Sequence, residues 1–156
     1  SGNVARKIFK RFNNFFSGNS FPMPKTILDT DIEELRLIGL SYRKAEYINN
    51  IAQAFLDKSD IYLNLDKMSD DEIIANLTKV KGIGLWTAQM FLMFTLNRPD
   101  IFPATDLAMQ KGFQIYFGLK SLPKPNMMIQ RSEEWIPYRT TVSLYLWSVL
   151  EGPFEW

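Results

Sequence analysis

Hydrophobic residues recur at helical spacing along almost the whole chain. A stripe of this kind, which predicts a first amphipathic helix, consists of Val4, Ile8, Phe12, Phe15 and Phe16. Runs that alternate apolar and polar residues with a period of two, as half-buried strands do, are missing. The pattern therefore predicts an all-α protein.

Polar capping residues mark where several helices begin. Thr30 with Glu33 has the spacing of a capping box, in which two side chains satisfy backbone amides at a helix start. Ser69 with Glu72 repeats that spacing. Ser41 precedes a longer helix, whose inward-facing positions are expected to be Ile48, Ile51, Ala52 and Phe55.

The second half of the chain predicts a central helix and a loop. Residues 86–96 are apolar nearly all round, which is typical of a buried helix. Pro99 and Pro103 bracket the loop that follows it. Thr105 or Asp106 is expected to cap the next helix.

Three further helices complete the prediction. The helix after the loop extends to about Phe117, and prolines then interrupt the chain at Pro123 and Pro125. Residues 127–135 and 138–150 carry the pattern of two final helices.

Composition removes several kinds of chemistry. The 156 residues contain neither cysteine nor histidine. Disulfides, cysteine-ligated metals and histidine bases are therefore excluded, and carboxylates become the leading candidates for catalysis. The net charge of +1 does not by itself indicate a polyanionic partner, so a basic patch could arise only from local clustering of lysine and arginine.

Nothing in the sequence predicts a membrane segment. The longest uncharged apolar run, Leu85 to Leu96, is shorter than the roughly 20 residues that a membrane helix needs. Basic residues interrupt the apolar positions near the start, unlike a signal peptide. We expect a soluble intracellular protein.

The segment KVKGIGLWTA, residues 79–88, joins a capped helix to the apolar one. Glycine after a helix is often only a C-cap. However, Gly82 and Gly84 lack a Cβ, so a phosphate could approach the unpaired amides at the next helix start, beside Lys79 and Lys81. An ordinary helix–helix turn and a nucleic-acid backbone site both remain open on these residues.

Longer stretches of the chain resemble a known enzyme superfamily. LTKVKGIGLWTAQMFLMFTLNRPDIFPATDLAMQKGF is similar to the helix-hairpin-helix DNA glycosylases, and most similar to their 3-methyladenine DNA glycosylase II branch. GLSYRKAEYI and IPYRTTVSLYLW resemble two further parts of that branch. The resemblance covers nearly all of residues 1–156 and places the hairpin at about residues 70–96.

The resemblance implies a fold and a boundary. It implies an all-α catalytic core of roughly seven to nine helices in two lobes with a cleft between them. The similarity begins part-way into the family, so the usual N-terminal portion, which carries a residue that wedges into the DNA, is expected to be lacking.

The resemblance also assigns the residues of the active site. Asp106 in PATD matches the catalytic aspartate, although its residue type and place also suit a simple N-cap. Thr105 stands where related proteins often carry a second acidic residue. Trp86 replaces the lysine of members that also cut the strand through a Schiff base, which implies release of the base alone.

The substrate pocket is assigned in the same way. Trp86 matches a tryptophan beside the flipped base, Met90 a further pocket position, and Trp147 another pocket aromatic. Each of these residues could equally be part of the core. Tyr138 and Arg139 match a Pro-aromatic-Arg stretch that is expected to support the site.

The hairpin is expected to bind the DNA backbone. The positions that match are Lys81, Gly82, Gly84 and Thr87. The backbone carbonyls of Thr78, Val80 and Ile83 align with carbonyls that hold a monovalent cation, Na⁺ or K⁺, in this superfamily. The resemblance implies no other cofactor.

The function expected from the resemblance is DNA repair. A monomeric enzyme would flip an alkylated purine of the 3-methyladenine or 7-methylguanine type out of double-stranded DNA and hydrolyse its N-glycosidic bond. It would leave an abasic site and have no lyase activity. It would work with the DNA, in the cytoplasm or nucleoid of a bacterium or the nucleus of a eukaryote.

Two other functions fit parts of the sequence. A non-catalytic helix-hairpin-helix DNA-binding module would make Asp106 dispensable. A helical scaffold domain would not bind DNA even at low salt. Proximity of Asp106 to Trp86 would favour the enzyme.

Overall fold

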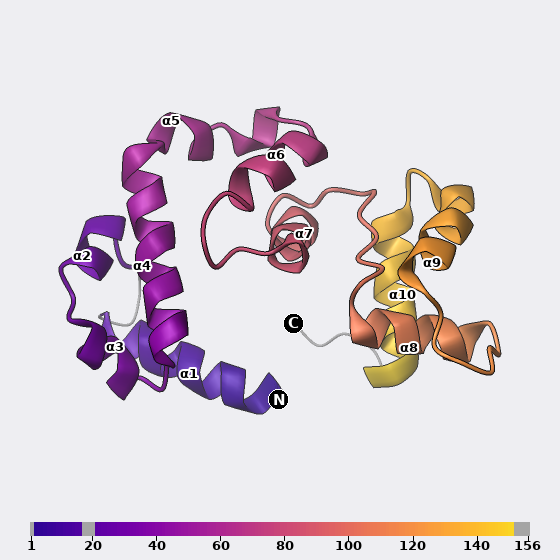
Figure 1. Ribbon diagram of the computed structural model, residues 1–156, viewed down its shortest axis with the longest axis horizontal. Coiled ribbons are helices and arrows are strands. Elements are labelled where there is room, and N and C mark those ends of the chain that lie inside the picture. The colour runs from indigo at the N-terminus through magenta and orange to yellow at the C-terminus, as the bar shows by residue number, and fades with distance from the viewer. Residues whose placement is uncertain (1, 17–20, 152–156) are drawn as a thin grey trace. The chain divides into compact units, whose positions relative to one another are not determined.

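The computed structural model describes residues 2–16 and 21–151. These residues form ten α-helices and two short 3₁₀ helices, and none of them belongs to a strand. The all-α prediction is therefore confirmed (Figure 1). The chain divides into two compact units, residues 1–84 and 85–156.

The first unit contains seven helical segments. They are α1 (Gly2–Phe15), α2 (Pro24–Leu28), α3 (Ile32–Leu37), α4 (Tyr42–Asp57), α5 (Ser59–Tyr62), the 3₁₀ helix η1 (Leu65–Lys67) and α6 (Asp70–Leu77). The sequence pattern did not predict α2 and α5, because one or two turns are too short to show a helical period.

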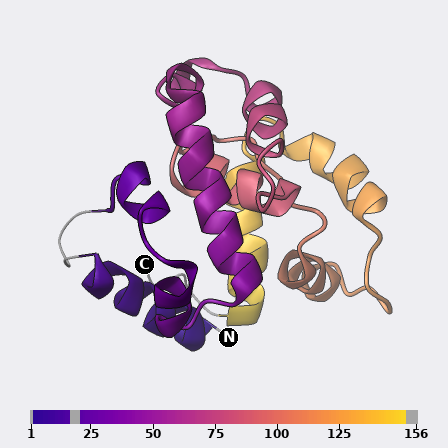
Figure 2. The ribbon, with the colours of Figure 1, turned by 60° about the vertical axis from the view of Figure 1, so that its left-hand side comes forward.

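The core of this unit forms where α1, α3 and α4 meet. Leu35, Ile38 and Ala45 are buried, and Ile8 and Phe12 of α1 pack against them. Helix α4 has α2 and α3 beside it, as Figures 1 and 2 show. Ile8, Phe12 and Phe16 of the predicted stripe therefore pack on the core, whereas Val4 and Phe15 are exposed.

One predicted cap lies a residue away from its expected position. The capping box of α3 is formed by Asp31 and Glu34, not by Thr30 and Glu33. Asp31 accepts a hydrogen bond from the Glu33 amide at 2.8 Å, while the Thr30 hydroxyl donates to the Thr26 carbonyl of the preceding turn. Aspartate is a stronger N-cap than threonine, which accounts for the shift.

The other two predicted caps are confirmed. Ser41 caps α4, and Ser69 with Glu72 forms the capping box of α6. The prediction that Phe55 faces inward is wrong, because its side chain is exposed and stacks on Tyr62 with ring centroids 4.6 Å apart.

The second unit carries the remaining helices. They are α7 (Leu85–Phe94), α8 (Leu107–Tyr116), α9 (Pro125–Ser132), the 3₁₀ helix η2 (Glu133–Trp135) and α10 (Arg139–Glu151). Asp106, rather than Thr105, is the N-cap of α8, and Phe117 is its C-cap.

Helices α8 and α10 pack at very short range. Gly112 of α8 is buried, and a Cβ at this position would overlap the Leu146 carbonyl of α10. Only glycine allows this approach of the two backbones. This contact could not be predicted from the sequence, because Gly112 stands alone in a helical pattern.

Helix α7 is less buried than its composition predicts. Ala88, Leu92 and Met93 are buried, but Leu85 and Trp86 in its first turn are 45% and 49% exposed. The prediction of a helix buried all round is therefore wrong for the end that follows the glycine turn.

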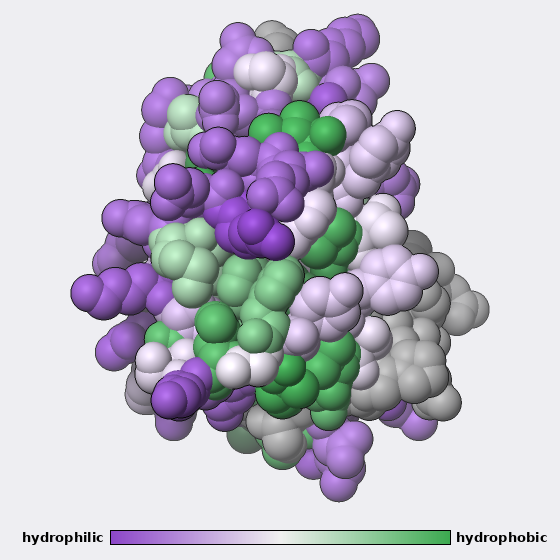
Figure 3. Space-filling view, turned by 90° about the vertical axis from the view of Figure 1, so that its right-hand side faces the viewer, coloured by the Kyte–Doolittle hydropathy of each residue, from purple (hydrophilic) through white to green (hydrophobic). Residues whose placement is uncertain are grey.

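Apolar side chains also reach the surface of the second unit. Figure 3 shows patches of apolar residues between polar ones on one face of the molecule. Exposed apolar side chains of this unit include Ile115, Tyr116, Ile129, Ile136 and Tyr138. No helix within the described ranges, 2–16 and 21–151, is long and apolar enough to cross a membrane.

Candidate active site

Asp106 and two tryptophans meet in the second unit. The indole N–H of Trp86 donates to Asp106 Oδ2 at 2.8 Å, and that of Trp147 donates to Asp106 Oδ1 at 3.0 Å. The tryptophans come from α7 and α10, whereas Asp106 begins α8. Three helices therefore contribute to one cluster, which we call the Asp106 cluster.

The Asp106 carboxylate also acts as the N-cap of its own helix. Oδ1 accepts the Met109 amide at 2.7 Å, so the carboxylate receives three N–H donors in all. Oδ1 takes two of them and Oδ2 takes one. Since each carboxylate oxygen has about two acceptor sites, Oδ2 keeps more capacity for a further partner.

The surroundings of the Asp106 carboxylate are N–H groups and the N-terminal end of α8. N–H donors and the positive end of the α8 dipole both stabilise negative charge. Neither tryptophan carries a charge that could pair with the carboxylate. The cluster therefore presents an anion, held in a fixed orientation, beside an aromatic surface.

The two tryptophans differ in burial. Trp86 is half-exposed, and its indole edge is turned to Asp106. Trp147 is only 6% exposed and stacks on Phe94 with ring centroids 6.3 Å apart. Trp86 can therefore offer a ring face to a ligand, while Trp147 combines core packing with its hydrogen bond. Met90, one turn after Trp86, is partly buried.

The glycine turn of the hairpin is held by α4. Lys81 Nζ lies 2.6 Å from Glu46 Oε1, and the Lys81 carbonyl accepts from Asn50 at 3.1 Å. The hydrogen bond from the Lys81 ammonium to the Glu46 carboxylate raises the pKa of Lys81. Lys81 therefore does not stand as an uncompensated positive charge, which the sequence could not reveal.

The surroundings of Gly82 differ from those of Gly84. Gly82 has φ +114°, and a Cβ there would overlap the Tyr47 ring. Gly84 has nothing within 4 Å of an added Cβ. We expected a phosphate to approach both glycines closely. At Gly82 the Tyr47 ring occupies that space instead, whereas Gly84 has open space beside it. Thr87, in the first turn of α7, is exposed.

The carbonyls expected to hold a cation lie in the same turn. The Thr78 carbonyl belongs to the end of α6, where carbonyls lack helical partners. The Val80 carbonyl accepts the Ile83 amide at 3.0 Å, which leaves one lone pair. Uncharged oxygens of this kind suit a weakly bound Na⁺ or K⁺. No group of three carboxylates suited to a divalent metal occurs in the part of the chain that the structure describes.

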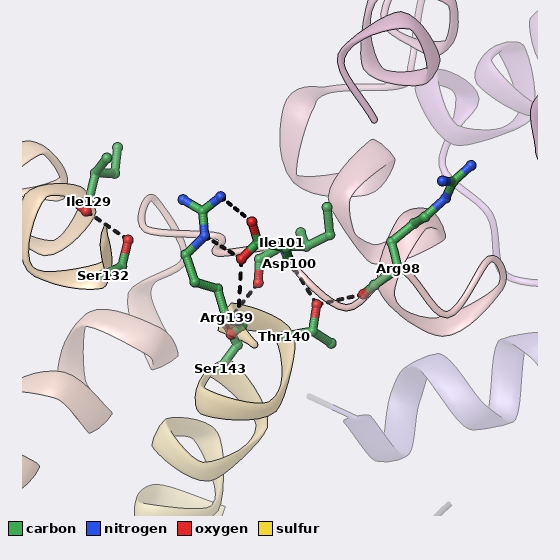
Figure 4. A network of polar contacts seen from close by, with 8 residues as sticks. All are labelled: Arg98, Asp100, Ile101, Ile129, Ser132, Arg139, Thr140 and Ser143. Atoms are coloured by element: carbon green, nitrogen blue, oxygen red, sulfur yellow. Dashed lines mark hydrogen bonds and ion pairs between the residues drawn. The ribbon is translucent and has the colours of Figure 1, made fainter. Parts of the chain in front are cut away.

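The Arg139 side chain pairs with Asp100. Its guanidinium makes two hydrogen bonds to Asp100, at 2.6 and 2.7 Å (Figure 4). Tyr138 is exposed. Arg139 lowers the pKa of Asp100 by its hydrogen bonds, and Asp100 raises the pKa of Arg139 in the same way. The sequence pattern did not single out Asp100.

A separate hollow of about 570 Å³ lies at the other end of α8. Its lining includes Tyr116, Phe117 and Trp135. Asp106 is the N-cap of α8, whereas Phe117, which lines the hollow, is its C-cap. The hollow is therefore separate from the Asp106 cluster.

The chain matches a family defined as "HhH-GPD superfamily base excision DNA repair protein" over residues 2–138. It is 37% identical over 145 residues to DNA-3-methyladenine glycosylase 1 of Schizosaccharomyces pombe, covering 92% of this chain and 64% of that protein. It is 38% identical over 131 residues to the putative DNA-3-methyladenine glycosylase YfjP of Bacillus subtilis, covering 84% of this chain and 46% of that protein. The chain therefore spans about half to two thirds of the length of these relatives.

A solved structure shares the fold. The S. pombe 3-methyladenine DNA glycosylase in complex with abasic DNA superposes with a TM-score of 0.87 at 35% identity, covering 98% of this chain and 76% of that one. A DNA-3-methyladenine glycosidase from Bacillus halodurans gives a TM-score of 0.81 at 31% identity, covering 96% and 69%.

Proposed function

The chain belongs to the HhH-GPD superfamily of base excision DNA repair proteins, and we propose that it is a DNA glycosylase of the 3-methyladenine II type. Its substrate would be an alkylated purine in double-stranded DNA, of the 3-methyladenine or 7-methylguanine type. The observation that carries this proposal is the pair of indole hydrogen bonds that fix the Asp106 carboxylate.

The aromatic face of Trp86 supports the substrate class. A purine methylated at N3 or N7 carries a formal positive charge, and the electron-rich face of tryptophan attracts such a ring by about 1 kcal/mol or more when water is excluded. The exposed indole is available for this contact once the base has left the helical stack.

The charge of Asp106 supports the reaction. As the N-glycosidic bond breaks, its electron pair leaves with the base, which becomes neutral, and positive charge builds on the sugar. The carboxylate would stabilise that charge through Oδ2. Water then bonds to the sugar carbon and loses a proton, which leaves an abasic site. Because the leaving base is already cationic, no general acid is needed.

The residue at position 86 supports a monofunctional enzyme. A Schiff base with the sugar needs a nucleophilic amine, and Trp86 has none. We therefore propose hydrolysis without strand cleavage. Borohydride would then trap no covalent adduct between the protein and a lesion-containing duplex; a trapped adduct would contradict this part of the proposal.

The hairpin would bind the DNA backbone through Lys81, Gly82, Gly84 and Thr87. Gly84, with open space beside it at the start of α7, is the best supported contact. We also propose that Na⁺ or K⁺ is held by the carbonyls of Thr78, Val80 and Ile83. DNA affinity measured in K⁺ and in tetramethylammonium, at equal ionic strength, tests this cation. We further propose that the protein is a monomer that works where the DNA is.

The test of the proposed function is base release. The protein is incubated with duplex DNA methylated by an alkylating agent, and the freed bases are separated by chromatography. We expect 3-methyladenine and 7-methylguanine to appear. The Asp106→Asn variant should bind the same DNA and release at least about 100-fold less base. DNA binding without release by the unsubstituted protein would favour a non-catalytic module instead.

A further inference from the structure

An ion pair joins the loop before Asp106 to the start of α10. Asp100 lies in that loop, and Arg139 is the first residue of the helix. Their two side-chain hydrogen bonds measure 2.6 and 2.7 Å, and the Arg139 amide lies 3.4 Å from the same carboxylate. Both side chains are about three-quarters buried, with 24% and 23% of their surfaces exposed. Figure 4 shows the pair and its neighbours.

Further hydrogen bonds fix the same two segments to each other. The Thr140 hydroxyl donates to the Arg98 carbonyl at 2.6 Å and accepts from the Ile101 amide at 2.9 Å. The Ser143 hydroxyl, fully buried, lies 3.1 Å from the Ile101 carbonyl. Residues 98–101 are therefore held against the first turn of α10 (Figure 4).

The backbone between Asp100 and Asp106 is held in place by burial and hydrogen bonds. Phe102, Pro103 and Ala104 are buried. The Ala104 amide donates to the Phe102 carbonyl at 2.9 Å, and the Asp106 amide donates to the Pro103 carbonyl at 2.9 Å. The Gln110 side chain donates to the Ala104 carbonyl at 3.0 Å. A shift of the loop at Asp100 would therefore be passed on to the Asp106 carboxylate.

Helix α10 forms the other connection. Trp147 follows Arg139 by about two turns, or about 12 Å along a straight helix. The loop and the helix thus both start at the Asp100–Arg139 pair, and they meet again where Trp147 donates to Asp106 at 3.0 Å. The two segments form a closed frame with an ion pair at one end and the candidate catalytic carboxylate at the other.

We propose that the Asp100–Arg139 pair is a positioning device for the active site. It holds the loop and α10 in the register at which the Trp147 indole reaches the Asp106 carboxylate. Two parallel hydrogen bonds fix orientation as well as distance, which a lysine ammonium could not do. The part of this proposal that concerns reaction rate rests on the proposed function, whereas the hydrogen-bond geometry does not.

The first test observes the Trp147 indole directly. Each tryptophan gives one indole N–H signal in an ¹⁵N-labelled sample, and the Trp147→Phe variant identifies that of Trp147 by its loss. In Arg139→Gln and Asp100→Asn, we expect the Trp147 indole proton to exchange with water at least about ten-fold faster, because its acceptor is no longer held in place. The signal should also move away from its hydrogen-bonded position.

The second test measures base release under single-turnover conditions. A displacement of about 1 Å can cost up to about 100-fold in rate, so we expect a loss of about ten-fold or more in both variants. Affinity for the duplex should stay within about two-fold, since neither residue belongs to the proposed DNA contacts. Arg139→Lys keeps the charge but loses the paired geometry, and should lie between the wild type and Arg139→Gln.

A matched control separates this role from a general effect of surface charge. Arg131 and Glu134 form an exposed ion pair on the same unit, with a distance of 3.0 Å. Arg131→Gln removes the same positive charge there as Arg139→Gln removes from the proposed positioning pair, and it should alter neither the indole exchange nor the release rate. The double variant Asp100→Arg/Arg139→Asp re-forms a pair with reversed charges. It should recover part of the protection of the Trp147 indole proton and part of the rate of base release.

The outcomes decide between positioning and mere stabilisation. Unchanged indole exchange in folded Arg139→Gln would overturn the proposal, as would an unchanged release rate. If Arg139→Gln does not fold, the same two readouts on Arg139→Lys decide. If the wild type releases no base at all while Trp147 exchange still accelerates in the variants, the positioning geometry stands and the proposed function fails.

Discussion

The indole N–H of Trp86 donates to Asp106 Oδ2 at 2.8 Å, although the two residues are 20 positions apart in the chain. A second indole, that of Trp147, reaches the other carboxylate oxygen from 41 positions away. Tryptophan donates only one hydrogen bond and accepts none. Both rings are therefore fixed by the same carboxylate, and the carboxylate is in turn fixed by them.

Replacing each tryptophan by phenylalanine removes the donor but keeps an aromatic ring. We expect Trp86→Phe and Trp147→Phe each to slow base release by about ten-fold or more, because one hydrogen bond that orients Asp106 is lost. Single-turnover rates measure this effect. Their effects on stability should differ: Trp147 is 6% exposed and Trp86 is 49% exposed, so only Trp147→Phe should lower the melting temperature clearly.

Trp135→Phe serves as the control for both variants. Trp135, in η2, stacks on Phe117, the C-cap of α8, with ring centroids 6.2 Å apart. Its replacement should lower stability without slowing release. If Trp86→Phe released base as fast as the wild type, the indole hydrogen bond would have no part in the reaction.

The order of the elements was accessible from the sequence, but the contacts between them were not. Helical periodicity and capping residues placed most of the longer helices, since both signals are local. The Asp106 position followed from the motif. Asp100 and Gly112 were missed, because each acquires its role only from α10, which lies far along the chain. The same holds for Glu46, whose pairing with Lys81 spans 35 positions.

The two glycines of the hairpin should respond differently to alanine. Gly82→Ala forces a side chain into left-handed backbone and into the Tyr47 ring, so it should lower the free energy of unfolding by about 1–3 kcal/mol. At Gly84 an added Cβ would meet open space, so Gly84→Ala should change the free energy of unfolding by no more than about 0.5 kcal/mol. Its added methyl group should instead weaken DNA binding. Urea unfolding and a duplex titration measure the two effects; a Gly84→Ala protein that binds DNA normally would remove Gly84 from the interface.

The Lys81–Glu46 pair should limit the contribution of Lys81 to DNA affinity. Glu46→Gln leaves the lysine charge uncompensated beside the hairpin amides, so we expect affinity at low salt to rise by about two- to three-fold. Because Glu46 already compensates part of this charge, Lys81→Met should lower the dependence of log affinity on log salt by less than the roughly 0.9 unit expected for an unpaired lysine. Glu134→Gln gives the same change of net charge at the exposed Arg131 pair and controls for it. Weaker binding by Glu46→Gln would show that the pair positions the turn rather than restraining Lys81.

Acid should weaken the Asp100–Arg139 pair in a defined direction. The hydrogen bonds from Arg139 hold the pKa of Asp100 below the ordinary value of an aspartate, so the folded state favours the ionised carboxylate more than the unfolded state does. The pair's pH-dependent contribution is therefore fully present above the unfolded pKa and is lost as the pH falls through the folded one. We expect Asp100→Asn to lower the free energy of unfolding by about 1–3 kcal/mol at pH 7, and this difference from the wild type to shrink steadily below about pH 4. Urea unfolding of both proteins between pH 7 and pH 2.5 measures it. Glu72 and Glu33, whose pKa values are also lowered, remain in both proteins and cancel in the comparison. A difference that stayed constant with pH would mean that Asp100 contributes by packing alone.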